Sequence, residues 1–450
     1  MHTYQPKNFR DRPQNIDNTG RKKRLKPKQP KGKWYNRRLI VGWFLILFLV
    51  LAPFIKIGGE PFMLFDIAHR RFSLFGVTIW AQDSFLLAMI MLVLVVSIVL
   101  FTVAFGRIWC GWACPQTLFM ELVFRPIEYL FDGNLRQGNK KKKTKLRVFG
   151  KHLTFFLVAI LITHVFIYWF TGPKRLLEIM TAPISENYLG LMLMFFISVF
   201  YYWIYAFFRE QVCTMICPYG RMQGVLLDSK SISVIYDYKR GEPRGASTAG
   251  DCIDCKRCIS VCPTGIDIKN GSQLECVNCT ACIDECNIVM KRLGKPENLI
   301  RFDSFQGIET GKRSFGNART YGYSVVLLIL FIVLAFTIAK RNPIETSLLR
   351  VPGTIYQEVD DKNYSNIYNL KIINKTNSDK TLNIELISPL MGNIQITTDI
   401  IDLNKRGKIE SVAIIKIPKL LITKHSTPIT IGIYENEELL ETYTTNFVGP

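Results

Sequence analysis

Acidic side chains are scarce in this sequence of 450 residues. It has 36 Asp and Glu against 57 Lys and Arg, which leaves a net charge of +21, yet 48% of its residues are hydrophobic. A soluble protein of that charge is not expected to have a mean hydropathy of +0.15. Apolar helices that alternate with basic loops, as in membrane proteins, account for both values. A nucleic-acid-binding domain is the alternative, but the basic residues flank apolar segments instead of forming one basic region.

An apolar run at the N-terminus is also missing. The first 38 residues are polar and basic, and the first apolar segment begins too late for the hydrophobic region of a signal peptide. No cleavable signal is therefore expected. The stretch Arg21–Lys33 is rich in Lys, Arg and Pro and cannot bury a core. Residues 1–38 are predicted to be a disordered, basic cytoplasmic arm, whose charge sets the topology or contacts anionic lipid heads.

Five apolar segments are each long enough to cross about 30 Å of hydrocarbon as a helix. They are residues 39–57, 84–105, 153–171, 188–208 and 321–339. The first four are predicted to form a transmembrane core over residues 39–208. Lys and Arg are dense in 1–38 and 106–152 but sparse in 58–83 and 172–187. The positive-inside rule therefore places the N-terminus and residues 209–320 in the cytoplasm, and residues 342–450 outside.

The twelve cysteines all fall into short clusters. Two of these clusters, CIDCKRCISVCP from Cys252 and CVNCTACIDECN from Cys276, have the same spacing, Cys-x2-Cys-x2-Cys-x3-Cys. This spacing is typical of ferredoxins with two [4Fe–4S] clusters, in which the fourth cysteine of each run binds the other cluster. Zinc more often uses separated Cys-x2-Cys pairs, and disulfides of secreted domains have wider spacings.

The ferredoxin spacing predicts two ligand sets in a domain at about residues 245–295. Cluster 1 is assigned Cys252, Cys255, Cys258 and Cys286; cluster 2 is assigned Cys276, Cys279, Cys282 and Cys262. The residue after Cys286 is Asn287, where this motif usually has Pro, which affects the local turn and not the ligand. Such clusters transfer one electron at a time, so this domain, called the insert below, is predicted to carry electrons. A purely structural pair of clusters is the alternative.

Two further cysteine pairs follow the second and fourth apolar segments. Cys110 and Cys114, and likewise Cys213 and Cys217, form the motif Cys-x-x-x-Cys-Pro, which suggests a duplicated membrane core. These four thiolates could meet at one cytoplasmic site. Soft thiolates favour Cu(I), but zinc or a further cluster would also suit them. Unliganded small apolar residues at a helix end are the alternative, which two matching pairs, each followed by Pro, argue against.

A glycine-rich nucleotide loop is absent from the sequence. NAD(P)H or flavin is therefore not expected to bind this chain. Electrons would have to come from a separate, unidentified donor or from quinol.

Cysteine is absent from the last part of the chain, residues 342–450, where Ile, Thr, Val and Tyr are frequent. Five short strands separated by turn-prone residues are predicted there and indicate a small β-sandwich. The predicted strands are residues 368–373, 382–388, 394–400, 409–417 and 429–434. A sandwich needs no cofactor and often serves as a docking module.

The combined pattern resembles the cytochrome c oxidase accessory proteins of the CcoG/FixG/RdxA family. The matching stretches are CGWACPQT (Cys110–Thr117), CPYGRMQG (Cys217–Gly224), CIDCKRCISVCPTGIDIKNG (Cys252–Gly271), ECVNCTACIDECN (Glu275–Asn287) and the Asn366–Thr376 stretch. The last of these resembles the start of that family's C-terminal immunoglobulin-like domain. The resemblance implies a multi-domain protein of the bacterial inner membrane. It has a five-helix transmembrane core, a two-cluster ferredoxin-like insert and a periplasmic immunoglobulin-like β-sandwich.

The resemblance also implies a function in the maturation of cbb3-type cytochrome oxidase, by reduction of Cu(II) to Cu(I) at the cytoplasmic face. Its partners would be oxidase assembly components and copper-handling proteins, and its copper site would be Cys110, Cys114, Cys213 and Cys217. Two other functions stay open. One is a quinol- or ferredoxin-linked polyferredoxin electron carrier, and the other is a non-redox scaffold for oxidase assembly.

Overall fold

The computed structural model describes the chain except for residues 1–24, 68–70, 81–82, 134–143, 246–248, 272, 313–317, 354, 377, 397–400, 406 and 423. Residues 1–24 of the predicted arm and 397–400 of the third predicted strand thus lie outside the described residues. The chain divides into two compact units. The first contains most of residues 25–334, and the second contains the C-terminal region with two short segments, Lys56–Pro61 and Ser73–Trp80.

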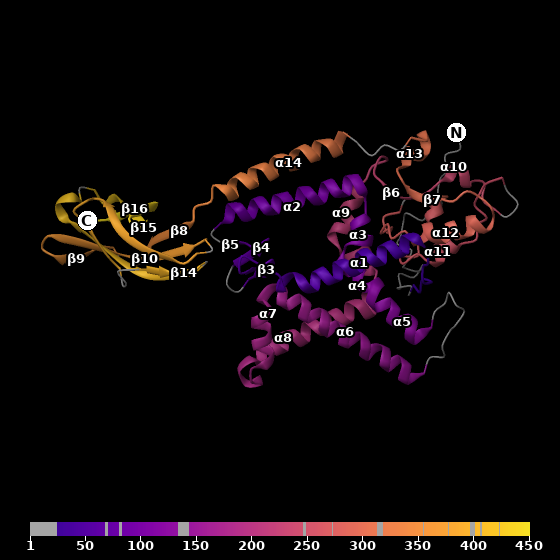
Figure 1. The fold of residues 1–450 in the computed structure, drawn as a ribbon, viewed down its shortest axis with the longest axis horizontal. Helices are drawn as coiled ribbons and strands as arrows, with labels where there is room; N and C mark the ends of the chain where they lie inside the picture. The colour runs from indigo at the N-terminus through magenta and orange to yellow at the C-terminus, as the bar shows by residue number, and fades with distance from the viewer. Residues whose placement is uncertain are drawn as a thin grey trace. The chain divides into compact units, whose positions relative to one another are not determined.

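Five helices of the described chain are long and apolar enough to cross a membrane. Their mean hydropathies are 1.9 to 3.1, and most of their side chains are not covered by protein, as lipid-facing helices require. They are α1 (Lys33–Leu51), α2 (Ser84–Phe105), α6 (Lys145–Thr171), α8 (Ile184–Trp203) and α14 (Ala318–Ala339), shown in Figure 1. The predicted bounds of α2 are confirmed, whereas α6 begins eight residues before the predicted segment.

Short elements connect these helices. The turn η1 (Ala52–Phe54) extends α1, and the five strands before α2 have no counterpart in the prediction: β1 (Lys56–Ile57), β2 (Glu60–Pro61), β3 (Met63–Asp66), β4 (Arg71–Leu74) and β5 (Val77–Trp80). Helix α7 (Pro173–Thr181) links α6 to α8. Between α6 and α8, buried Ser198 donates a hydrogen bond to Thr163 at 3.1 Å. An aromatic core contains Phe124, Phe155 and Tyr205, with Phe124 stacked on Tyr205 at 4.3 Å between ring centroids.

The two Cys-x-x-x-Cys-Pro motifs share one backbone geometry. The residue four positions before the first cysteine turns the chain sharply: Gly106 has φ 57° and ψ −132°, and Arg209 has φ 57° and ψ −123°. The second cysteine, Cys114 or Cys217, then precedes a helix whose first residue is proline. Proline suits this position because the amide that it lacks would have no partner there. These matching turns support the duplication that the sequence suggested.

The elements of the two motifs have the following bounds. The first contains α3 (Ile108–Trp112), α4 (Pro115–Phe119), the π-turn η2 (Met120–Phe124) and α5 (Arg125–Asp132). The second contains the π-turns η4 (Ile204–Phe208) and η5 (Val212–Ile216), followed by α9 (Pro218–Leu226).

The cysteine-rich insert is a small domain built on two antiparallel strands. Strand β6 (Ser233–Tyr236) pairs with β7 (Ile300–Asp303), so that Ser233 lies opposite Asp303. Its helical elements are α10 (Tyr238–Gly241), α11 (Arg257–Ser260), η6 (Ile268–Asn270) and α12 (Ala281–Arg292), with α13 (Phe305–Thr310) after β7. Apolar side chains such as Ile266, Ile283 and Leu299 fill its core among the cysteines.

Part of the predicted arm is ordered against this domain. The Lys28 amide donates a hydrogen bond to the Ser260 carbonyl at 2.8 Å. The Asp284 carboxylate accepts hydrogen bonds from the amides of Trp34 and Tyr35 at 3.2 and 2.7 Å, so it caps the start of α1. For residues 25–38 the prediction of a disordered arm is therefore wrong: α1 begins at Lys33, and a carboxylate distant in the sequence satisfies its first amides.

The C-terminal region is a β-sandwich, as predicted. One sheet has the order β12-β14-β10-β8, with β9 also pairing with β10, and the other has the order β13-β11-β15-β16. The strands are β8 (Ile344–Arg350), β9 (Gln357–Asp360), β10 (Asn363–Asn374), β11 (Lys380–Ser388), β12 (Asn393–Ile396), β13 (Ile401–Leu403), β14 (Lys408–Pro418), β15 (Ser426–Glu435) and β16 (Glu438–Val448), with the turn η7 (Lys419–Leu421) before β15. Fully buried Tyr368, Ile415 and Ile431 pack between the sheets. Strands β8, β9, β13 and β16 were not predicted.

Candidate iron–sulfur and thiol sites

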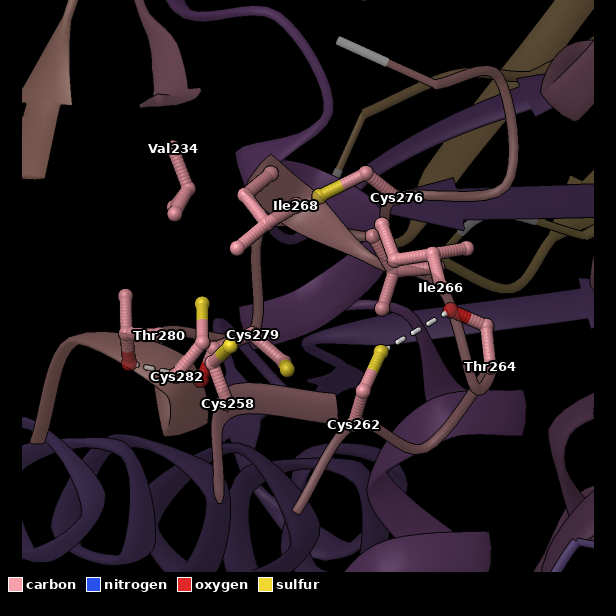
Figure 2. Close-up of a pocket in the computed structure, with 11 residues that line it drawn as sticks. Val234, Cys258, Cys262, Thr264, Ile266, Ile268, Cys276, Cys279, Thr280 and Cys282 are labelled. Carbon is pink, nitrogen blue, oxygen red and sulfur yellow. Dashed lines mark hydrogen bonds between the residues drawn. The ribbon is translucent and has the colours of Figure 1, made fainter. Parts of the chain in front are cut away.

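Eight cysteines of the insert surround two hollows. The first hollow, of about 390 Å³, is lined by Cys252, Cys255, Cys258 and Cys286, together with apolar side chains such as Ile253, Val289 and Leu299. The second hollow, of about 350 Å³, is lined by Cys262, Cys276, Cys279 and Cys282, and Cys258 also reaches it. Figure 2 shows the thiols of the second hollow with Ile266 and Ile268. Apart from Cys258, which lines both hollows, each cysteine lines the hollow of the set to which the sequence assigns it, and the ligand sets themselves stay a prediction.

The two halves of the insert use the same backbone turns to bring their cysteines together. Asp254 and Lys256 in the first half have φ values of 51° and 56°, and Asn278 and Thr280 in the second have 52° and 65°. These residues stand two and four positions after the first cysteine of each half. Left-handed turns at such positions cost conformational energy for residues other than glycine. Because the same turns occur in both halves, the chain wraps around each hollow in the same way.

The surroundings of these thiols suit an iron–sulfur cluster better than a bare thiol. Burial raises the pKa of Cys258, Cys276 and Cys286 to about 12, so a proton is retained unless a metal replaces it. Soft thiolates in a largely apolar cavity are the donors that iron–sulfur clusters use. Each thiolate of a cubane binds a different iron, so the four thiols surround the cluster instead of converging on one ion. The donor set and the hollows therefore fit two [4Fe–4S] clusters.

The two Cys-x-x-x-Cys-Pro motifs are called the membrane motifs below. Their four cysteines lie close to one another. Burial raises the pKa of Cys213 to about 12, and the nearby Cys114, Cys110 and Cys217 add to this shift. The Cys110 thiol donates a hydrogen bond to Gln223 Oε1 at 3.5 Å, and Gln223 is fully buried. Among the described residues, Gln223 Nε2 has no hydrogen-bond partner. Within the same residues no three His, Cys, Asp or Glu side chains form a closed site for a single metal ion.

The second hollow adjoins the Cys110 turn. Cys110 packs against an apolar cluster of Val261, Val277, Cys279 and Ala281, of which Val277 and Cys279 line the hollow. The indole nitrogen of Trp112 donates a hydrogen bond to the Asn278 carbonyl at 3.1 Å. Gly111 permits the close approach of the Val277–Asn278 backbone, because a Cβ atom at position 111 would lie 2.2 Å from the Val277 carbonyl oxygen. The loop that carries Cys276 and Cys279 thus rests directly on the membrane motif.

Buried charges surround the junction between the Cys276 loop and the motif that contains Cys110, and the local sequence pattern does not predict their pairing. Arg38 donates a hydrogen bond to the Gly111 carbonyl at 2.7 Å and lies 3.7 Å from Glu121. Glu121 also pairs with Arg125, which in turn pairs with Glu210. A buried ion pair needs good geometry to offset the loss of hydration. Glutamate in an otherwise apolar stretch after the first motif was the only sequence signal for this network.

Comparison with known proteins finds family models that match three parts of the chain. Residues 208–249 and 242–305 match a family model described as a 4Fe–4S dicluster domain, and residues 87–143 match one described as a 4Fe–4S binding domain. Residues 334–450 match the model of the IG-like fold at the C-terminal of FixG. Protein RdxA of Cereibacter sphaeroides is 30% identical over 77% of this chain and 78% of its own length. The chain belongs to the FixG/RdxA family.

Two other relatives of this FixG/RdxA-family chain have similar identities. The nitrogen fixation protein FixG of Rhizobium meliloti is 32% identical over 63% of this chain and 57% of its own length. Protein RdxB of Cereibacter sphaeroides is 29% identical over 80% of this chain and 81% of its own length. The fold expected from the sequence is confirmed: a membrane-helix core, ferredoxin-type 4Fe–4S domains and an immunoglobulin-like C-terminal domain. The protein is a membrane iron–sulfur electron-transfer protein of the FixG/RdxA type.

A methyl group at Gly111 should weaken the junction. We expect Gly111→Ala to lower the free energy of unfolding by about 1–3 kcal/mol, since the backbone of Val277 must move to accommodate it. The measurement is thermal unfolding in detergent, followed by cluster absorbance. Gly322→Ala is the matched control, because Gly322 lies in α14 with open space around it and alanine favours a helix. Equal unfolding temperatures of the two variants would show that the close contact between Gly111 and Val277 is absent.

Proposed function

We propose that this protein reduces Cu(II) to Cu(I) at the membrane thiols, with electrons delivered through its ferredoxin-like insert, to supply copper for cbb3-type oxidase assembly. The observation that supports this most directly is the packing of Cys110 against Val277 and Cys279 in the wall of the second hollow. Electron transfer between two sites is fastest when little protein separates them. The contact of Cys110 with Val277 and Cys279 provides such a short separation.

The ligands of the two clusters are assigned as the hollows group them. Cys252, Cys255, Cys258 and Cys286 would hold the first cluster; Cys276, Cys279, Cys282 and Cys262 would hold the second. When bound, such clusters supply one-electron transfer at potentials that the protein tunes by burial and nearby charge. Cys255 is the exposed member of the first set, whereas Cys279 is buried beside the membrane motif. An external donor would therefore approach the first set.

The residues of the membrane motifs have the chemistry required for copper as substrate. Cys110, Cys114, Cys213 and Cys217 present soft sulfur, which binds Cu(I) more strongly than harder ligands do. Gln223 offers an amide nitrogen without a partner among the described residues, and it can hydrogen-bond to a thiolate at this site. One electron converts Cu(II) to Cu(I), so a one-electron carrier matches the reaction in stoichiometry. Sulfur ligation favours the reduced product over the substrate.

A third iron–sulfur cluster at the same thiols is the second candidate. It is favoured by the match of residues 87–143, which include Cys110 and Cys114, to a 4Fe–4S binding domain. Four thiols without a closed single-ion geometry are also compatible with a larger metal centre. In that case the membrane site would conduct electrons and not bind copper, as in a polyferredoxin carrier.

Iron content distinguishes these two candidates. We expect about eight irons and eight sulfides per chain after anaerobic purification, because each of the two cubanes contains four irons and four sulfides. Cys276→Ser should lose about half of the iron, since it removes one ligand of one cluster. About twelve irons per chain would contradict the copper assignment, and about four would contradict the assignment of two clusters.

Copper reduction tests the proposed activity. Replacement of Cys110, Cys114, Cys213 and Cys217 by Ser should lower the rate of anaerobic Cu(II) reduction by more than about tenfold, because hard hydroxyls replace the sulfur ligands. Formation of Cu(I) is followed with a chromogenic Cu(I) chelator. Cluster absorbance of the variant provides the control that the insert is intact. Unchanged reduction would refute the thiol site, and wild-type protein that never reduces copper would favour an electron carrier or a scaffold.

The proposed sidedness follows from the basic loops. The N-terminus and the clusters would face the cytoplasm, and the immunoglobulin-like domain would face the periplasm, where it could dock oxidase assembly components. We expect a phosphatase fused to the C-terminus to be active, since that enzyme folds only outside the cytoplasm. If a reporter fused to the C-terminus is active only in the cytoplasm, the C-terminal domain lies on the cytoplasmic side and the proposed topology is wrong.

A further inference from the structure

Arg107 joins three segments at the junction of insert and membrane motif. It follows the turn at Gly106 that ends α2 and precedes α3. Its side chain is 5% exposed. The guanidinium donates hydrogen bonds to the carbonyls of Leu274 and Gly220. Leu274 stands two residues before Cys276, Gly220 stands three residues after Cys217, and Arg107 itself stands three residues before Cys110.

The charge of Arg107 is not paired with an acidic side chain among the described residues. In the part of the chain that the structure describes, its partners are backbone carbonyls and no carboxylate pairs with it. Its Nε has no partner among these residues either. Burial of an uncompensated cation is costly unless negative charge lies close by. Metal-bound sulfur would supply such charge at Cys276, two residues after Leu274, and at Cys110, three residues after Arg107.

The electrostatic effect of Arg107 extends to both sulfur sites. The charge of Arg107 acts on Cys110, which lies three residues further along the chain in α3. It also acts on Cys276, which lies two residues after the Leu274 carbonyl that Arg107 binds. A single buried cation thus favours negative charge at a cysteine of the second hollow and at a cysteine of the membrane motif.

We propose that Arg107 is a positioning residue that holds the Cys276 loop against the membrane motif and makes the second cluster easier to reduce than the first. The proposal rests on the electron route proposed above. A cluster gains one negative charge when it is reduced, so an unpaired cation nearby stabilises the reduced form. The first hollow lacks such a buried cation: of the basic side chains that line it, Lys269 and Arg257 pair with Asp254 and Glu285, and Lys256 is exposed to solvent. Electrons would therefore move towards the membrane motif.

The test is a redox titration of Arg107→Met, followed by electron paramagnetic resonance of the reduced clusters without copper. We expect half of the signal amplitude to shift to a lower potential and the other half to stay at the wild-type potential. Arg107→Lys keeps the charge but cannot bind both carbonyls with a planar fork, so its potentials should stay close to those of the wild type. Arg221→Met is the matched control, because Arg221 is exposed on α9 near the second motif. Neither potential should shift in this control.

Three results would overturn the proposal. They are an unchanged titration of Arg107→Met, an equal shift of both halves of the signal, or a shift in Arg107→Lys as large as in Arg107→Met. If Arg107→Met does not incorporate its clusters, Arg107→Gln removes the charge and retains hydrogen-bond donors, with the same expected shift.

Copper reduction then separates this proposal from the proposed function. Arg107→Met should reduce Cu(II) more than tenfold more slowly than the wild type. If the wild type reduces no copper while half of the signal still shifts in Arg107→Met, the copper function fails and the assignment of Arg107 stands. If the wild type reduces copper and neither half shifts, the assignment of Arg107 fails alone.

Discussion

Close backbone packing between Gly111 and the Val277–Asn278 segment is the constraint on which the proposed electron route depends. A side chain at position 111 would collide with a carbonyl oxygen, so only glycine allows the cluster-bearing loop to reach the turn that carries Cys110. Trp112 fixes the loop on one side by its hydrogen bond to Asn278, and Arg38 holds the Gly111 carbonyl on the other. Without this approach, the insert would be a ferredoxin tethered at an undefined distance from the membrane thiols.

The buried charges at the junction follow from the same constraint. A soluble domain that packs on membrane helices brings polar backbone groups out of water, and these groups need partners. Arg107 and Arg38 supply them as donors to carbonyls of both parts. The bidentate pair between Arg209 and Glu128 stabilises the corresponding turn of the second motif, where a residue other than glycine adopts φ 57°. Removal of one member of such a pair typically costs more than the pair contributes.

Much of this architecture could be predicted, because it follows from local patterns. The apolar length of α2 determined its bounds, and the spacing of the eight insert cysteines predicted the grouping around two hollows. Alternation of apolar residues identified β10, β11, β14 and β15. Strand β16 was missed because Glu438–Val448 contains few buried residues. The order of residues 25–38 was missed because its cause, the Asp284 carboxylate, is about 250 residues away in the sequence.

Long-range contacts also explain why the functional junction was not predicted. Nothing in the local sequence around Arg107 distinguishes it from the other basic residues that set the topology. Its partners Leu274 and Gly220 lie in two other segments, and its burial becomes visible only when all three are assembled. The same holds for Gln223, whose amide lies beside Cys110 only in the folded chain.

Transfer of electrons from the insert to copper at the membrane thiols can be measured in a single turnover. The protein is reduced anaerobically, freed from reductant and mixed with one equivalent of Cu(II), and the spectra of Cu(II) and of the reduced clusters are recorded together. We expect one cluster to be oxidised for each Cu(II) signal lost, in wild-type protein but not in Cys110→Ser. Clusters that stay reduced while the Cu(II) signal persists in the wild type would contradict the proposed route.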